Sequence, residues 1–149
     1  MPRLRRIMHA TDFSRASTPA FKWALELAKA NRSQLLVVHV VTPPTLALPP
    51  EGYVPPTLYQ TLEASARREA QKRLDALVGK ARRAGVRTSA ILLEGVPHER
   101  VARAARSKKA DLLVIGTHGR TGLARLFLGS VAARLVAMAP RPVLTVRGR

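Results

Sequence analysis

A short apolar run, a glycine-rich loop and a helical pattern follow one another towards the end of the chain, and this order restricts the fold most. The run 112–115 (LLVI) is short and partly β-branched, as expected of a strand buried on both faces of a parallel sheet. The run stops at Gly116, and Gly119 follows in the loop. Gly129 and Ser130 then open the helical pattern, whose apolar residues are Val131, Leu135, Val136 and Met138.

This strand–loop–helix order is a common way to hold a phosphate group. Glycines let the backbone approach an anion closely, and the N–H groups at the start of a helix point at it. Ser130 would supply a hydroxyl and cap the helix, while Arg120 and Arg125 bring positive charge to the loop. The pattern therefore indicates a nucleotide site. The alternative is that the glycines only end the strand and that Gly-Ser only caps the helix.

Strand-like and helix-like segments alternate along the whole chain. Strands are expected over residues 4–10, 35–41, 86–92, 112–115 and 143–146. The helices expected between them are one that Ser14 or Ser17 caps and that has Pro19 in its first turn, one over 57–84, one that Pro97 starts and one after Gly129. This alternation predicts an α/β fold, a doubly wound parallel sheet of five strands with helices on both faces.

A proline-rich segment, residues 42–57, separates the second strand from the long helix. Its paired prolines exclude a helix or an inner strand, so we expect a surface loop. Because the segment follows the carboxyl end of a strand, it could fold over a ligand there, or it could be an inert connector. Residues 1–149 contain no internal repeat, and we expect them to form one domain.

The composition restricts the class of protein further. Without cysteine there is no disulfide framework, no thiolate metal site and no cysteine nucleophile. The first residues lack the apolar stretch of a signal peptide, and no apolar run is long enough to cross a membrane. These features lead us to expect a cytoplasmic protein.

The net charge is unusually high, because 26 lysines and arginines stand against 9 acidic residues and give +17. A field of this sign attracts nucleotides, nucleic acid and acidic lipid headgroups. With only 4% aromatic residues, the chain has no stacking platform for single-stranded nucleic acid. We therefore interpret the basic residues of the long helix as a solvated face, and the charge could also serve solubility or stability at high temperature. Those residues are Arg67, Arg68, Lys72, Arg73, Lys80, Arg82 and Arg83.

Sequence motifs of common catalytic sites are absent. The chain has no GxxxxGK[ST], no GxSxG and no HExxH. His9 and His39 fall in expected strands and are interpreted as core histidines. His98 stands at a helix start, and His118 lies in the glycine loop, where it could contact a phosphate or ribose or simply face solvent. Since no obvious general base lies beside the loop, we expect at most slow nucleotide hydrolysis.

Several segments together resemble the universal stress protein family. They are TDFS after the first strand, HVV at the end of the second, GVPHERV before the third helix and PRPVLTV at the end. The family's nucleotide pattern, Gly-x2-Gly-x9-Gly-Ser, is present as Gly116, Gly119, Gly129 and Ser130. The sequence is therefore similar to the ATP-binding branch of the family, and not to the branch that lacks this pattern.

The resemblance implies a sheet of order 3-2-1-4-5, as in adenine nucleotide alpha hydrolase-like folds, that binds ATP or another adenine nucleotide. In that order the first and fourth strands flank the reversal, where ligands bind beyond the carboxyl ends of the strands. Asp12 would lie beside the ribose, although it could instead only favour the dipole of the following helix. The residues that we expect at the nucleotide are Ala10, Thr11, Asp12, Val40, Gly116, Gly119, Arg120, Gly129, Ser130 and Val131.

Among these residues, Val40 would meet the adenine with its backbone, and the glycine loop would hold the phosphates together with Mg²⁺ or Mn²⁺. Ala10 stands where the family commonly has proline, and we expect little effect from this difference. The resemblance also implies a homodimer that pairs the last strand, 143–146, with its copy. The predicted function is a nucleotide-dependent stress-response or sensor protein. The alternatives are a slow ATPase and a basic protein that binds nucleic acid through the long helix.

Overall fold

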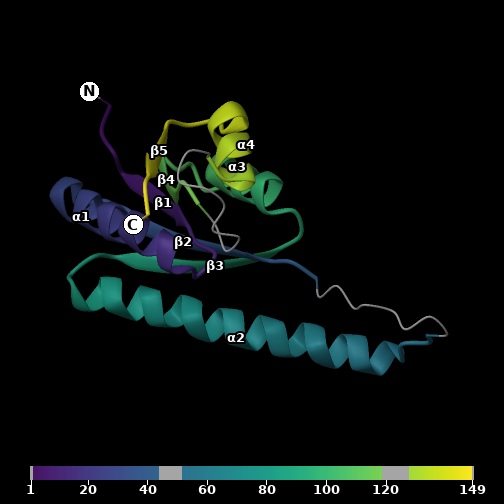
Figure 1. Cartoon of the computed structure of the whole chain (residues 1–149). Coiled ribbons are helices and arrows are strands. Elements are labelled where there is room, and N and C mark those ends of the chain that lie inside the picture. Colours follow the sequence, from purple (N-terminus) through teal and green to yellow (C-terminus); the bar gives the residue numbers. More distant parts are fainter. Residues whose placement is uncertain (1, 44–51, 119–127, 149) are drawn as a thin grey trace.

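The computed structural model describes residues 2–43, 52–118 and 128–148, and a parallel sheet forms its centre (Figure 1). Its strands are β1 (Arg6–Ala10), β2 (Gln34–Val41), β3 (Thr88–Glu94), β4 (Leu112–Gly116) and β5 (Val143–Val146). They lie in the order β3-β2-β1-β4-β5, and every neighbouring pair is parallel. The predicted α/β class and strand order are confirmed, and the strand order reverses between β1 and β4.

Helices cover both faces of the sheet. Their bounds are α1 (Thr18–Asn31), α2 (Pro56–Arg83), α3 (Pro97–Ser107) and α4 (Ser130–Met138), with a short 3-10 turn, η1 (Arg15–Ser17), before α1. The apolar residues of α1 and α2 pack on one face, and those of α3 and α4 pack on the other (Figure 1). As expected, prolines lie in the first turns of α1 and α3, where the missing N–H has no helical partner to lose.

The core follows from the alternation of side chains along the central strands. On β1, Ile7 packs towards α1 and α2, while Met8 packs towards α3 and α4, and both are fully buried. The inner strand β2, between β3 and β1, is buried almost throughout, which explains why its sequence is an apolar run without alternation. Because these strands are buried, their ends and the loops that follow them are held in place by the core.

Several details differ from the sequence-based expectations. The helix α2 begins at Pro56, inside the segment 42–57 whose paired prolines were expected to exclude a helix, because a proline fits the first turn. The third strand ends at Glu94 and not at residue 92. The third strand begins at Thr88 and not at residue 86, because the N–H of Val86 still donates to the carbonyl of Ala81 and so completes the end of α2. The first strand begins at Arg6 and not at residue 4. Ser17 occupies the N-cap position of α1, but its hydroxyl donates to the Ser14 carbonyl and caps nothing.

The long helix α2 is buried over only part of its length. Leu74 in its second half is fully buried, whereas Leu58 near its start is 47% exposed. Figure 1 shows that this first part of α2 extends beyond the sheet. The apolar repeat predicted the helix correctly, but not where its support by the sheet ends.

Candidate functional site

A pocket of about 620 Å³ opens at the carboxyl edge of the sheet, where β1, β2 and β4 end. The reversal of strand order between β1 and β4 leaves a gap beyond these two strands, because their connections leave towards opposite faces. Residues from the ends of the three strands, from α2 and α3 and from the start of α4 line it. The site therefore lies where the fold class places ligands.

The turn after β1 is held by hydrogen bonds of its own side chains. Asp12 Oδ1 accepts from the N–H of Ser14 at 2.9 Å, and Thr11 Oγ1 accepts from the N–H of Phe13 at 3.0 Å. Thr11 also donates its N–H to the Val38 carbonyl at 2.9 Å, which ties the turn to β2. Phe13 has a φ of 62°, in the left-handed region that a phenylalanine rarely adopts. A turn with this many constraints holds the Asp12 carboxylate at the pocket.

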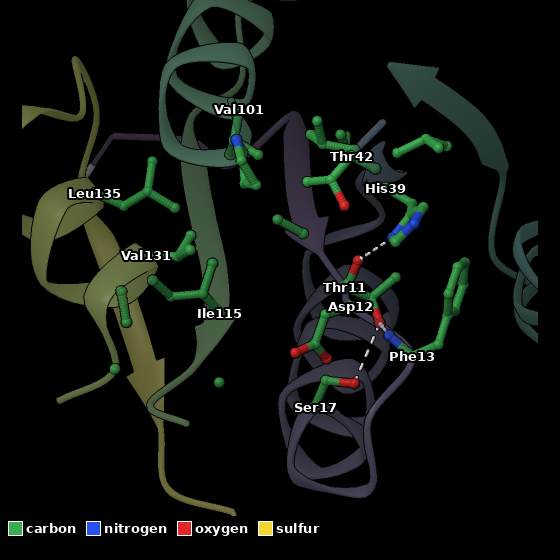
Figure 2. Close-up of a pocket in the computed structure, with 18 of the residues that line it drawn as sticks. Thr11, Asp12, Phe13, Ser17, His39, Thr42, Val101, Ile115, Val131 and Leu135 are labelled. Carbon is green, nitrogen blue, oxygen red and sulfur yellow. Dashed lines mark hydrogen bonds between the residues drawn. The ribbon is translucent and has the colours of Figure 1, made fainter. Parts of the chain in front are cut away.

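A pair of aromatic rings closes the pocket on the α2 side. His39 Nδ1 donates to the Thr11 carbonyl at 2.7 Å, and its ring lies 4.3 Å from that of Phe13 (Figure 2). The Arg73 guanidinium of α2 lies 5.9 Å from the centre of the Phe13 ring, and its Nε donates to Glu69 at 3.0 Å. His39 is 9% exposed and so is the near-core histidine that the sequence predicts, but it also lines the pocket.

The ends of the glycine loop meet at the opposite side of the pocket. The N–H of Gly129 donates to the Thr117 carbonyl at 2.6 Å, so the start of α4 lies directly beside the end of β4. Gly129 is the N-cap residue and has no side chain with which to cap the helix, so the prediction that Ser130 caps it is wrong. The first N–H groups of α4 have no helical acceptor, and among the described residues no side chain is seen to cap them, so an anion could accept from them.

Apolar side chains line the α3 and α4 side of the pocket. Val101 of α3 is buried, as are Ile115 of β4 and Leu135 of α4, and Figure 2 shows all three on this side. Val131, in the first turn of α4, also faces the pocket and is 39% exposed. This surface suits a flat aromatic base, while the β1 turn offers a carboxylate and the start of α4 offers backbone N–H groups.

Comparisons with known proteins give the family of the chain. The family model of the Universal stress protein family matches residues 3–147. Universal stress protein MJ0531 of Methanocaldococcus jannaschii is 37% identical over 144 residues, which cover 96% of this chain and 82% of the relative. The chain belongs to the universal stress protein family.

Solved structures of the universal stress protein fold superpose over nearly the whole chain. The structure of the hypothetical protein MJ0577 has a TM-score of 0.84 at 21% identity and covers 99% of both chains. A universal stress protein described as a complex with cAMP has a TM-score of 0.65 at 26% identity, covering 99% of this chain and 100% of that one. The fold is therefore that of the universal stress protein family, with the strand order that the sequence predicts.

Most of the predicted site residues come together in the pocket. Eight of the ten line it: Ala10, Thr11, Asp12, Val40, Gly116, Gly129, Ser130 and Val131. Gly119 and Arg120 lie outside the described residues, as does Arg125. At Gly116 an added β-carbon would lie 3.2 Å from the Ala16 carbonyl oxygen, a tighter contact than most β-carbons make. The close approach of η1 thus gives this glycine a structural reason besides any ligand.

Sequence reasoning missed the residues that complete the walls. Val101 and Leu135 line the pocket, although in the sequence they are ordinary apolar helix positions, and Phe13 lines it although it was expected only as part of the turn after the first strand. Thr42 and Arg73 also reach it from segments far from the glycine pattern. The signal that could have found Val101 and Leu135 is the predicted topology itself, which brings the starts of α3 and α4 to the same edge as Asp12.

The second histidine that was predicted in a strand, His9, lies in the core. His9 is fully buried on β1, where Nδ1 donates to the Val114 carbonyl at 3.0 Å, and burial lowers the pKa of His9 to about 4. Its neutral ring contacts Phe21 and does not line the pocket, as expected of a core histidine.

Over the described ranges, no helix is long and apolar enough to cross a membrane. In the same ranges, no three His, Cys, Asp or Glu residues form a metal-binding group.

Proposed function

We propose that this universal stress protein binds ATP or another adenine nucleotide in the carboxyl-edge pocket and acts as a nucleotide-dependent sensor in a stress response. The observation that carries the proposal is the meeting, in one pocket, of a fixed carboxylate, an apolar wall and a helix start whose N-cap residue is a glycine. Each part suits one part of an adenylate. The relative described as a cAMP complex supports the class of ligand.

The phosphates belong at the start of α4. The N–H of Gly129 is taken by the Thr117 carbonyl, so the backbone N–H groups that can meet a phosphate begin at Ser130, and the helix dipole adds partial positive charge there. The hydroxyl of Ser130 is exposed and can donate to a phosphate oxygen. Gly119 and Arg120 would complete this cradle, and a divalent ion, Mg²⁺ or Mn²⁺, would bridge phosphate oxygens.

The ribose and the base belong between β1, β2 and the apolar wall. Asp12 can accept from ribose hydroxyls, as carboxylates at this topological position do in nucleotide-binding folds. Val40 lies at the end of β2, and its backbone can hydrogen bond to the edge of the adenine ring. Val101 and Leu135 would then cover the face of the ring.

We propose binding with slow turnover at most. Asp12 and Glu69 are the carboxylates that line the described part of the pocket. Asp12 accepts from the Ser14 N–H, and Glu69 forms an ion pair with Arg73 at 3.0 Å. Both carboxylates are thus engaged in the turn or on α2, which does not suit a general base that must orient a water molecule at the phosphates.

Titration calorimetry with ATP, dATP and GTP tests this function. We expect wild-type protein freed of nucleotide to bind ATP more tightly than GTP. Asp12→Asn keeps the oxygen that accepts from Ser14 but loses the charge, so the β1 turn should persist while ATP affinity falls about tenfold. Affinity for dATP should fall less, because one hydroxyl is already missing. No heat with any nucleotide, with or without Mg²⁺, would refute the proposal.

We further propose a homodimer through β5, the strand at one edge of the sheet. The Leu113 N–H donates to the Pro142 carbonyl and the Thr117 N–H donates to the Val146 carbonyl. Since successive residues alternate, Val143 and Thr145 turn their backbone groups away from β4. Their N–H and C=O groups are free to pair with the β5 strand of a second copy in the antiparallel direction.

The substitution Val143→Pro tests the dimer without breaking the sheet. It removes an N–H that points away from β4, so the β4–β5 hydrogen bonds remain. We expect light scattering to show a monomer for Val143→Pro and a dimer for the control Val143→Ala, which keeps the N–H. A monomeric wild type, or an unchanged mass for Val143→Pro, would contradict the proposed pairing.

A further inference from the structure

The amino edge of the sheet, opposite the pocket, carries half of the chain's 26 lysines and arginines. Five segments meet there: residues 2–6, 29–34, 80–88, 106–112 and 138–143. We call their basic residues the amino-edge cations. They are Arg3, Arg5, Arg6, Lys29, Arg32, Lys80, Arg82, Arg83, Arg87, Arg106, Lys108, Lys109 and Arg141.

The topology gathers these cations from far apart in the sequence. In a parallel sheet every strand begins at the same edge, so the end of each preceding helix lies there too. Figure 1 shows the N-terminus, the end of α1 and the turn from α2 into β3 on the same side of the molecule. The cluster therefore depends on the fold as a whole and not only on the basic residues of the long helix.

Almost nothing within the protein neutralises these charges. Asp111 is the one acidic residue in the five segments, and its Oδ2 accepts from the backbone N–H groups of Arg5 and Arg6. Of the amino-edge cations, only Lys29 makes an ion pair among the described residues, with Glu26 at 3.3 Å. All of the amino-edge cations except the half-buried Arg6 are exposed. Positive charge thus accumulates over the edge.

Stabilisation of helix ends explains only some of these residues. A cation in the last turn of a helix favours the dipole, but this effect falls off within one turn. Arg3, Arg87 and Arg141 lie outside any helix. Arg32 and Lys109 both have a φ of 53°, where glycine would relieve the backbone. The chain thus has basic side chains at positions where local stability favours glycine.

The edge also has a concave part. A groove of about 370 Å³ lies between the end of α1 and the turn into β3. Lys29, Arg32 and Arg87 line it, together with Ser33 and the backbone of Gly85. Among the described residues, no acidic side chain lines this groove. A phosphate group placed there would meet three cations from two different connections.

We propose that the amino edge binds the phosphodiester backbone of duplex nucleic acid without reading its sequence. At about 4.8 Å per strand, the five strands span about 19 Å, and a duplex carries about one charge per 1.7 Å of its axis. None of the five segments contains an aromatic residue to stack on unpaired bases, which favours a duplex over a single strand. Met138 is the only exposed large apolar side chain in the five segments, so this edge has little apolar surface that could insert into a lipid bilayer.

Fluorescence anisotropy with a labelled duplex DNA of mixed sequence tests the proposal, because phosphate contacts weaken steeply with salt. We expect the variant Arg32→Gly/Lys109→Gly to bind at least about tenfold more weakly at 50 mM salt. The slope of log affinity against log salt should become shallower by about 2. The same variant should unfold at an equal or higher temperature, because glycine relieves both backbones, so lost binding could not be due to lost folding.

The matched control removes the same charge elsewhere. Arg68→Gln/Lys72→Gln alters two exposed cations of α2, and Arg68 lies about 22 Å along the helix from its end at Arg83. We expect this control to keep most of the duplex affinity. Equal losses in both variants would show attraction by net charge alone and overturn the proposal. It would also be overturned by tighter binding of a single strand, or by binding of phosphatidylserine vesicles without binding of the duplex.

Discussion

The two edges of the sheet are built from the same strands but present opposite chemistry. At the carboxyl edge, strand ends and helix starts surround a pocket of about 620 Å³ with apolar walls, one turn with a carboxylate and open backbone N–H groups. At the amino edge, helix ends and strand starts are joined by short turns that expose lysine and arginine. One edge thus combines a pocket with apolar, acidic and backbone groups, and the other carries mainly positive side chains with a smaller groove.

The direction of the helices explains this difference. Each helix starts at the carboxyl edge with free N–H groups and ends at the amino edge with free C=O groups. Free N–H groups can hold an anion directly, as we propose for α4. Free C=O groups cannot, so an anion at the amino edge has to be bound by side chains. Both edges can thus receive phosphate, one through the backbone and the other through side-chain charge.

The largest effect on stability should come from the side chain that anchors the pocket's α4 wall. Leu135 is fully buried below the start of α4, whereas its neighbour Val136 is 51% exposed. We expect Leu135→Ala to lower the free energy of unfolding by about 2–5 kcal/mol and Val136→Ala by less than about 0.5 kcal/mol. Urea unfolding measures both. Similar losses in the two variants would mean that α4 is not anchored as described.

A smaller and pH-dependent effect should come from His9, on the central strand between the two edges. Burial lowers its pKa from 6.5 to about 4 on folding, so the unfolded chain binds the proton more readily than the folded protein. The stability is fully present above pH 6.5 and is lost as the pH falls towards 4. The difference corresponds to about 3 kcal/mol.

Unfolding curves measured between pH 7 and 4 check the role of His9. His9→Gln can still donate to the Val114 carbonyl but does not titrate, so the loss over this range should shrink by about 3 kcal/mol. The control is His98→Gln at the start of α3, which should leave the pH dependence as in the wild type. A His9→Gln curve as steep as that of the wild type would contradict the buried neutral ring.

The smallest changes in stability should come from two substitutions at the amino edge, which test backbone strain apart from side-chain charge. Gly85 has a φ of 84° with nothing near the position of an added β-carbon, so Gly85→Ala should cost only the backbone strain, about 1–2 kcal/mol. Arg32→Gly makes the reverse change at a φ of 53° and should stabilise by up to about 1 kcal/mol. Thermal unfolding measures both. A lower melting temperature for Arg32→Gly would mean that its side chain serves the fold.

The sequence predicts the fold well because burial on both faces leaves a simple pattern in the central strands. The run Leu112 to Ile115 and the apolar segment of β2 show strands directly, and glycines or prolines separate them from the helices. The first residue of a strand is harder to predict from the sequence, since Val86 is apolar but still completes the end of α2. The exposure of Leu58 could not be predicted either, because an apolar repeat does not show where the sheet stops supporting the helix.

The candidate site was predictable only where a local pattern marks it. Asp12 and Gly129 lie in such patterns and face the same pocket. Arg73 does not, because its contact with Phe13 depends on the packing of α2 against the β1 turn. The amino-edge cations show the same limit, since only the parallel topology brings Arg3, Arg87 and Lys109 to one surface.

The most direct test of the central claim places a carboxylate where the phosphates should bind. Gly129→Asp puts an N-cap side chain on the open N–H groups of α4, and Gly129→Asn is its neutral control of the same shape. In calorimetric titration with ATP, we expect Gly129→Asp to lose at least about tenfold more affinity than Gly129→Asn, while both fold at least as stably as the wild type. Equal ATP affinity in the wild type and Gly129→Asp would contradict phosphate binding at the start of α4.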